Sequence, residues 1–111
     1  MASYEVMSEI IGKASAMDSF KKEIVGFNKT FLFKPSDAKP YHVEINNGTA
    51  TLAEGEVASP SATISATDQV LSDIFTGKTD AIKAFMQGQL KVSGDIFSAQ
   101  KLTGIVSKLR K

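Results

Sequence analysis

Few side chains in this sequence could carry out acid–base or metal chemistry. The one histidine, His42, falls on the outward phase of an alternating segment, beside Glu44. A general base usually needs a buried setting and an orienting partner, so we expect His42 to be a solvated surface residue. Glu54 and Glu56 share one face of a weaker strand, where solubility charges are favoured over a loose cation site. No imidazole or carboxylate cluster has the spacing of metal ligands.

Nucleophilic and phosphate chemistry also lack their sequence patterns. Gly77-Lys78-Thr79 superficially resembles a phosphate-binding loop, but the upstream glycine of that pattern is replaced by Ser72, and a helix rather than a strand precedes it. Serines and threonines are numerous, yet no nucleophile elbow is present and a single histidine leaves little for a triad. We therefore predict no catalytic residue, no bound metal and no cofactor.

The composition narrows the class of protein. A chain of 111 residues can bury a core as one domain, predicted here to span 1–111. Its net charge of +1 and its singly spaced lysines argue against nucleic-acid binding. The absence of cysteine excludes disulfides and fits a reducing compartment. We find no secretory signal and no run near the ~20 apolar residues of a membrane span, so we expect a cytoplasmic protein.

Apolar periodicity predicts the elements that position these residues. Helical spacing indicates one helix up to Ala14 with Ser3 as N-cap, and a second from Asp18 or Ser19 to Gly26. From Phe27 the period becomes two, which predicts strands. The strand segments are 27–33, 41–46, 49–56 and 62–67, with a hairpin turn at Asn46-Asn47-Gly48. Three or four antiparallel strands in succession would make a meander.

The last third of the chain returns to helical spacing. We expect a helix capped by Thr67 or Asp68 and ended by Gly77, and another from Asp80 to Gly88. A short strand at 90–93 then leads to a final helix capped by Asp95. An antiparallel-dominated sheet with helices on one face is the simplest architecture that buries all these apolar faces.

Large apolar side chains gather around the glycine turns of this third. Phe75, Phe85, Met86 and Phe97 stand there, and none carries reactive groups. Each either packs in a core or lines a ligand cavity. Periodicity does not separate these alternatives, because a cavity wall and a core face have the same spacing.

Four ordered segments resemble the type-2 sterol carrier protein family. The upstream pieces, including Tyr41–Gly48, fit as well, so the resemblance covers about residues 5–109. Its specificity lies in the ordered set, since no single segment is diagnostic. The four segments are Ala62–Asp68, Phe75-Thr-Gly-Lys78, Ala84-Phe-Met-Gln-Gly-Gln-Leu-Lys-Val-Ser-Gly-Asp95 and Ala99-Gln-Lys-Leu102.

The resemblance implies an α/β (α+β) fold, in which helices cover one face of a five-stranded, predominantly antiparallel sheet and enclose an apolar tunnel. It also implies non-enzymatic binding and transfer of fatty acids, fatty acyl-CoA or sterol-like lipids. Selectivity should be broad, because each buried methylene adds only about 0.8 kcal/mol. The residues implied to bind lipid are Phe31, Phe33, Phe75, Phe85, Met86, Leu90, Val92 and Phe97, then Gln87 and Gly88 near the mouth, and Leu102, Ile105, Val106 and Leu109 as a movable cover.

Two features depart from the family pattern. Tyr41 stands where the second strand often begins with Trp. Ser107-Lys108-Leu109, which ends many eukaryotic members as a peroxisomal signal, is followed here by Arg110-Lys111. The peroxisomal receptor reads a terminal carboxylate, so we expect no peroxisomal address.

Two function classes stay open. A carrier would hold a lipid as a monomer or weak homodimer and make transient membrane contact. An accessory module of the same fold would have a collapsed cavity and act in protein assembly. Ala50, Ala62 and Ala66 fit both, because small side chains either leave room for lipid or let helices pack closely.

Overall fold

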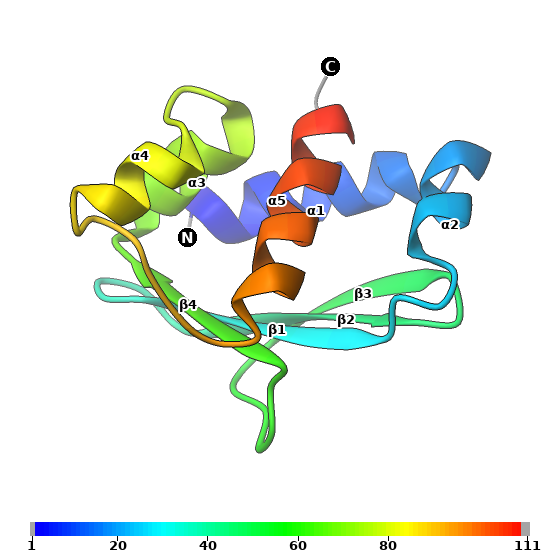
Figure 1. Cartoon of the computed structure of the whole chain (residues 1–111), viewed down its shortest axis with the longest axis horizontal. Helices are drawn as coiled ribbons and strands as arrows, with labels where there is room; N and C mark the ends of the chain where they lie inside the picture. The colour runs from blue at the N-terminus through cyan, green and yellow to red at the C-terminus, as the bar shows by residue number, and fades with distance from the viewer. Residues whose placement is uncertain (1, 110–111) are drawn as a thin grey trace.

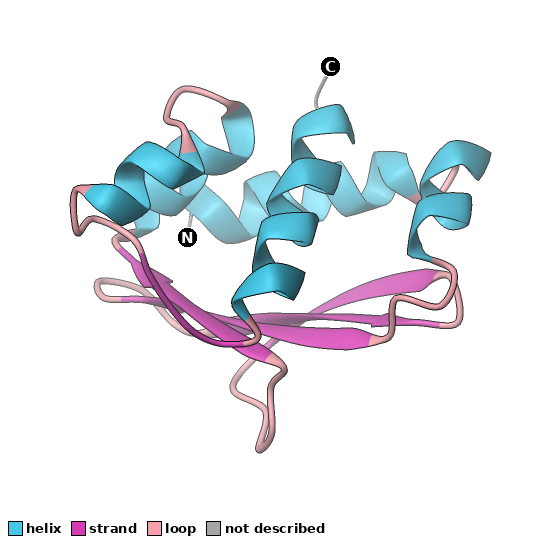
Figure 2. Cartoon of the chain, in the orientation of Figure 1, coloured by secondary structure: helices cyan, strands magenta, loops and turns pink. Residues whose placement is uncertain are grey.

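A computed structural model describes residues 2–109 and places the helices on one face of a five-stranded sheet (Figures 1 and 2). This mixed α/β arrangement is the fold class that the sequence predicted. None of the helices in residues 2–109 has the length and hydropathy that crossing a bilayer requires. The helices are α1 (Ala2–Ala14), α2 (Asp18–Ile24), α3 (Asp68–Thr76), α4 (Ala81–Met86) and α5 (Ile96–Leu109). The strands are β1 (Lys29–Pro35), β2 (Tyr41–Asn46), β3 (Thr49–Glu54), β4 (Ala62–Ala66) and β5 (Lys91–Gly94).

The strand order is β3-β2-β1-β4-β5, and three of its four pairings are antiparallel. Strands β1 to β3 form the predicted meander, and Asn47 and Gly48 turn the hairpin with φ of 52° and 77°. The alternative in which β4 continues the meander as a fourth antiparallel strand is wrong. Strand β4 pairs parallel with β1, with Phe33 opposite Ile64. Alternation indicates which face a residue occupies, not which strand is its neighbour.

The parallel pairing makes residues 55–61 cross the sheet on the face opposite the helices (Figure 1). His42 Nδ1 lies 2.9 Å from the Gly55 carbonyl oxygen, so His42 is half-buried against this crossover rather than fully solvated. Lys34 Nζ lies 3.7 Å from Glu56 Oε1. Leu32, which pairs with His42, is only 4% exposed.

The predicted caps of the last three helices are confirmed. Thr67 Oγ1 accepts from the Val70 amide at 3.1 Å and begins α3. Asp80 Oδ1 accepts from the Ile82 amide at 2.8 Å and begins α4. The Asp95 carboxylate takes the same role before α5, where its Oδ1 accepts from the amide of Ser98 at 3.1 Å. In each case a short polar side chain satisfies an amide that the helix cannot.

The predicted caps of the first two helices are wrong. Ser3 lies inside α1 and is fully buried, because its hydroxyl bonds to residues distant in the chain. Helix α2 begins at Asp18, and the residue before it, Met17, makes no side-chain cap. Acceptors of the right type stand near both helix starts, but tertiary contacts and backbone geometry decide which residue precedes the first turn.

The core lies between the sheet and the helices. The ring of Phe33 stacks on Tyr41 with centroids 5.2 Å apart and meets Phe75 of α3 edge-on at 5.6 Å. Each such pair is worth about 0.5–1.5 kcal/mol beyond its buried area. These rings hold α3 against β1 and β2. Figure 1 shows α4 beside α3, and α5 on the same face of the sheet.

Candidate functional site

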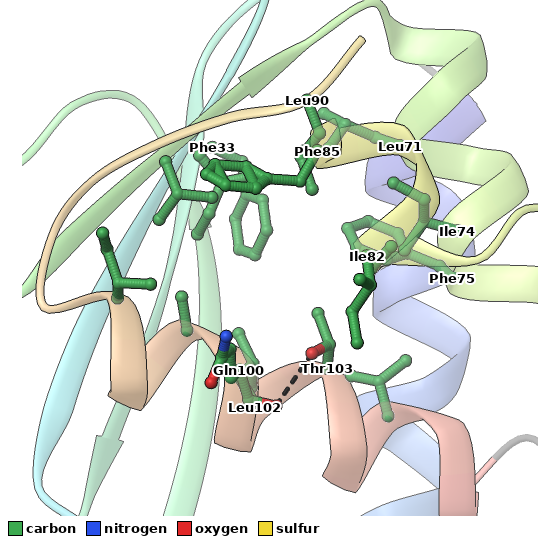
Figure 3. A pocket seen from close by; sticks show the side chains of 16 residues that line it. Phe33, Leu71, Ile74, Phe75, Ile82, Phe85, Leu90, Gln100, Leu102 and Thr103 are labelled. Carbon is green, nitrogen blue, oxygen red and sulfur yellow. Dashed lines mark hydrogen bonds between the residues drawn. The ribbon is translucent and has the colours of Figure 1, made fainter. Parts of the chain in front are cut away.

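An apolar cavity of about 120 Å³ lies between the sheet and helices α3, α4 and α5 (Figure 3). Its floor is made by Phe33 of β1, Ile64 of β4 and Val92 of β5. Strand alternation turns all three toward the helices, since Phe33 pairs with Ile64 and Ile64 with Val92. The walls are Leu71, Ile74 and Phe75 of α3, Ala81, Ile82 and Phe85 of α4, Leu90, and Ile96, Ala99, Gln100, Leu102, Thr103 and Val106 of α5.

A cavity of this size lowers the stability of a small domain only moderately. At about 24 cal/mol per Å³, a dry void of about 120 Å³ costs about 3 kcal/mol. A tunnel of about 400 Å³ would cost about 10 kcal/mol, which approaches the whole stability of a typical domain. The protein can therefore keep this smaller space open between its helices and sheet without a ligand.

The lining is suited to hydrocarbon. Among residues 2–109, no charged side chain lines the cavity, and its two polar lining residues are Gln100 and Thr103. Thr103 Oγ1 donates to the Gln100 carbonyl oxygen at 2.8 Å, so its hydrogen is already used within α5 (Figure 3). No buried side-chain nitrogen or oxygen of residues 2–109 lacks a partner. A charged group placed inside would lose its hydration, and no lining side chain of residues 2–109 offers it an opposite charge.

The cavity reaches solvent between α4 and the start of α5. Three of its large apolar lining residues are also substantially exposed: Ile82 at 64%, Phe85 at 46% and Ile96 at 42%. Apolar side chains that leave a cavity wall and enter water mark its mouth.

The carboxylate of Asp95, next in sequence to the mouth residue Ile96, already has partners. The Ser98 hydroxyl donates to Asp95 Oδ2 at 2.6 Å, and Lys29 Nζ lies 3.2 Å from the same oxygen. The Ser98 hydroxyl and amide, together with Lys29, lower the pKa of Asp95 to about 2. Among residues 2–109, no group of three or more His, Cys, Asp or Glu side chains could hold a metal ion.

Residues 11–107 match the SCP-2 sterol transfer family. The chain belongs to that family. This confirms the resemblance stated from the glycine-punctuated segments, all of which lie within the matched range.

Relatives with curated names are much longer than this chain. Peroxisomal multifunctional enzyme A of Dictyostelium discoideum is 31% identical over 86 residues, which cover 77% of this chain and 20% of that protein. Sterol carrier protein 2 of Gallus gallus is 32% identical over 93 residues, covering 79% and 16%. The chain thus spans a fifth or less of the length of these relatives.

Solved structures share the fold. The solution structure of sterol carrier protein 2 from Aedes aegypti, in complex with the C16 fatty acid palmitate, superposes with a TM-score of 0.71. That alignment covers 96% of each chain at 21% identity. At this sequence identity the similarity shows a shared fold, that is, the five-stranded sheet and its helical layer.

The structure brings together half of the residues that the resemblance implied to bind lipid. Phe31 is instead fully buried in the core, where its ring centroid lies 6.0 Å from that of Phe27. Ile105 and Leu109 line a second hollow of about 10 Å³, beneath α1 and α2. Met86, Gln87, Gly88 and Phe97 are exposed and stand outside the cavity lining. Those that line the cavity are Phe33, Phe75, Phe85, Leu90, Val92, Leu102 and Val106.

Several lining residues were missed from the sequence. Leu71 and Ile74 share the apolar stripe of Phe75, and Ile82 precedes Phe85 by one helical turn. Their helical spacing could therefore have placed them on the cavity wall. Ile96 carried none, because it lies at the start of α5, away from that helix's apolar stripe. Gln100 and Thr103 are polar and gave no reason to expect a cavity wall.

Proposed function

We propose that the protein binds the hydrocarbon chain of one lipid in this cavity and transfers it without catalysing a reaction. The observation that carries the proposal is an uncharged apolar cavity with a mouth formed by exposed apolar side chains. Family membership supports it, and so does the palmitate complex of a mosquito protein with the same fold. Fatty acids, fatty acyl-CoA and sterol-like lipids all offer the apolar part that this lining accepts.

Uptake of a lipid chain requires the cavity to widen. Sites for small molecules usually enclose about 300–1,000 Å³, and this one encloses about 120 Å³. Moving helix α4 costs less free energy than moving α5, since α4 has six residues and buries only Ala84. Helix α5 buries five side chains, among them Leu102 and Val106. We therefore assign the opening movement to α4 in place of the expected α5 cover.

Selectivity among chains should be broad. Transfer of each methylene into the cavity gains about 0.8 kcal/mol. The only polar residues in its lining, among residues 2–109, are the uncharged Gln100 and Thr103, and neither offers a charge to a particular head group. The head group would stay at the mouth, where water and the exposed ends of α4 and α5 are available.

The experiment is competition against a fluorescent fatty acid, using protein first freed of lipid by organic extraction. We expect palmitate, cholesterol and palmitoyl-CoA each to displace the probe, with inhibition constants within about tenfold of one another. A steep preference for one competitor contradicts broad selectivity. Failure of the probe to bind folded protein contradicts the proposal itself.

An accessory module in protein assembly is the second candidate. It is favoured by the match to a fifth of a multifunctional enzyme, where the corresponding segment is part of a larger chain. Native mass spectrometry of freshly purified protein separates the two. The added mass of one lipid supports the carrier, whereas a dimer without lipid supports the module.

A further inference from the structure

We propose that the mouth of the cavity docks on an anionic lipid bilayer through α4 and the first turn of α5. This inference rests on the proposed lipid binding and names the surface from which the lipid enters. In this proposal, the residues around the opening of the cavity are also the residues that contact the membrane.

The apolar part of this surface is unusually exposed. Five residues, here called the mouth patch, are all large and apolar, and three of them also line the cavity. Met86 and Phe97 extend the patch outward and are the most exposed, at 80% and 83%. Exposed apolar patches of this kind mark sites of interaction rather than ordinary surface. The mouth patch consists of Ile82, Phe85, Met86, Ile96 and Phe97.

Charge around the mouth patch favours an anionic partner. Residues 78–109 contain five lysines and two aspartates, whereas residues 2–77 contain six lysines and ten acidic residues. Both aspartates cap helices, since Asp80 bonds the Ile82 amide and Asp95 bonds Ser98. The segment that carries the mouth patch is therefore basic, although the whole chain is nearly neutral.

The nearest lysines are available for a partner. Lys78 and Lys83 flank the start of α4 and Lys91 follows its end. All three are exposed, and none forms an ion pair within residues 2–109. A short helix with large apolar side chains and neighbouring lysines is the pattern of a segment that lies in the interface of an anionic membrane.

A bilayer fits this surface better than a folded partner does. The mouth patch includes the mouth itself, so a partner seated there must either close the cavity or continue its apolar interior. A bilayer continues it, because the acyl chain can then pass from one hydrocarbon phase to the other without crossing water. Burying Met86 and Phe97 in that phase also offsets the cost of their present exposure.

The test measures sedimentation of the full chain with vesicles of phosphatidylcholine alone and with added phosphatidylglycerol. The double variant Met86→Ser/Phe97→Ser removes the outer mouth patch without touching the cavity lining. Val25→Ser is the matched control, because Val25 is 69% exposed but stands at the end of α2, away from α4 in Figure 1. Binding of a fluorescent fatty acid without vesicles is measured for every variant.

We expect the wild-type chain to sediment with anionic vesicles and to be released by salt. The double variant should bind anionic vesicles at least about tenfold more weakly than the wild type. Lys83→Gln should bind them about fivefold more weakly, and Val25→Ser should bind them as the wild type does. Equal sedimentation with both vesicle types overturns the docking inference, and so does an equal loss in Val25→Ser. If the protein still binds the fatty acid in solution in that case, the proposed lipid binding is retained and only the docking inference is rejected. If the wild-type protein does not bind the fatty acid in solution either, the docking inference and the proposed lipid binding are both rejected.

Discussion

Tyr41 donates its hydroxyl hydrogen to Ser3 Oγ across 2.7 Å and so ties the first turn of α1 to strand β2. Burial raises the pKa of Tyr41, which keeps this hydrogen in place. Ser3 Oγ in turn donates to Asp68 Oδ1 at 2.6 Å, at the start of α3. The backbone amides of Ala2 and Ser3 donate to the same carboxylate. Three elements distant in sequence are thus joined by one polar network, which is buried at Tyr41 and Ser3 and reaches the surface at Asp68.

This network predicts unequal costs for its two hydroxyls. Tyr41→Phe removes one hydrogen bond and should lower the free energy of unfolding by about 1 kcal/mol. Ser3→Ala leaves the buried Tyr41 hydroxyl without a partner and should cost about 2–3 kcal/mol. The double variant should cost less than the sum of the two. Urea unfolding measures all three, and strictly additive losses would mean that the two hydroxyls act independently.

Acid should weaken the fold through Asp68 and Asp95. Burial alone would raise the pKa of Asp68, but hydrogen bonds from the Ser3 hydroxyl and from the Ser3 and Ala2 amides outweigh it and lower that pKa. The pKa of Asp95 falls to about 2 from a model-compound value of 3.8. The unfolded chain therefore binds more protons in this range, so the stabilisation is complete above about pH 4 and is lost as pH falls toward 2.

The measurement is the thermal unfolding midpoint between pH 7 and pH 2. We expect a plateau at the upper end and a fall below about pH 4. Asp95→Asn should lower the plateau and flatten part of the fall. An unchanged acid profile in that variant contradicts the assignment of this dependence to Asp95.

The hydrogen-bond network also shows what the sequence could not predict. Ser3 is an ordinary N-cap candidate by type and position, and the partners that bury it lie 38 and 65 residues away. The caps at Thr67 and Asp80 were predicted correctly because they depend only on the next few residues. Strand faces were predictable for the same reason, whereas the parallel pairing of β1 with β4 depends on a crossover that periodicity does not record.

Two glycines with similar backbone angles should respond differently to alanine. Gly94 has φ of 87°, and an added Cβ would lie 2.6 Å from the Ser61 carbonyl oxygen. Gly88 has φ of 78° with open space around it. Gly88→Ala should cost about 1 kcal/mol from backbone strain alone. Gly94→Ala adds a clash with neighbouring backbone and should cost about 2–4 kcal/mol. Equal costs in chemical unfolding contradict the close approach at Gly94.

Leu102 should control the length of lipid chain that fits. Leu102 and Val106 line both the cavity and the small second hollow, so they separate the two spaces. Leu102→Ala should join them and move the preferred fatty acid to a length about two or three carbons greater. Leu71→Ala is the control, because Leu71 lines only the cavity.

A displacement series of saturated fatty acids from ten to eighteen carbons measures this shift. Each additional methylene that becomes buried should raise affinity about fourfold. The same optimum length in Leu102→Ala and in Leu71→Ala, with both proteins folded, contradicts the partition.

The cavity was only partly predictable for a physical reason. The sequence left core packing and a cavity wall open for Phe75, Phe85 and Met86; the first two line the cavity, whereas Met86 faces solvent. Neighbouring helical residues differ by about 100° in direction, and on a helix as short as α4 a few apolar side chains do not define one face. Which of them turns inward is fixed by the seating of Ala84 against the core.

This pair of neighbours gives the most direct test of the central claim, that the lipid chain enters this cavity. Phe85→Asp places a carboxylate on the cavity wall, whereas Met86→Asp places the same charge one residue away, outside the lining. Both side chains are substantially exposed, so both variants should fold. In solution, without vesicles, we predict that Phe85→Asp weakens binding of a fluorescent fatty acid at least about tenfold. Met86→Asp should bind like the wild type. Equal affinities in the two variants, or full uptake by Phe85→Asp, would contradict the account.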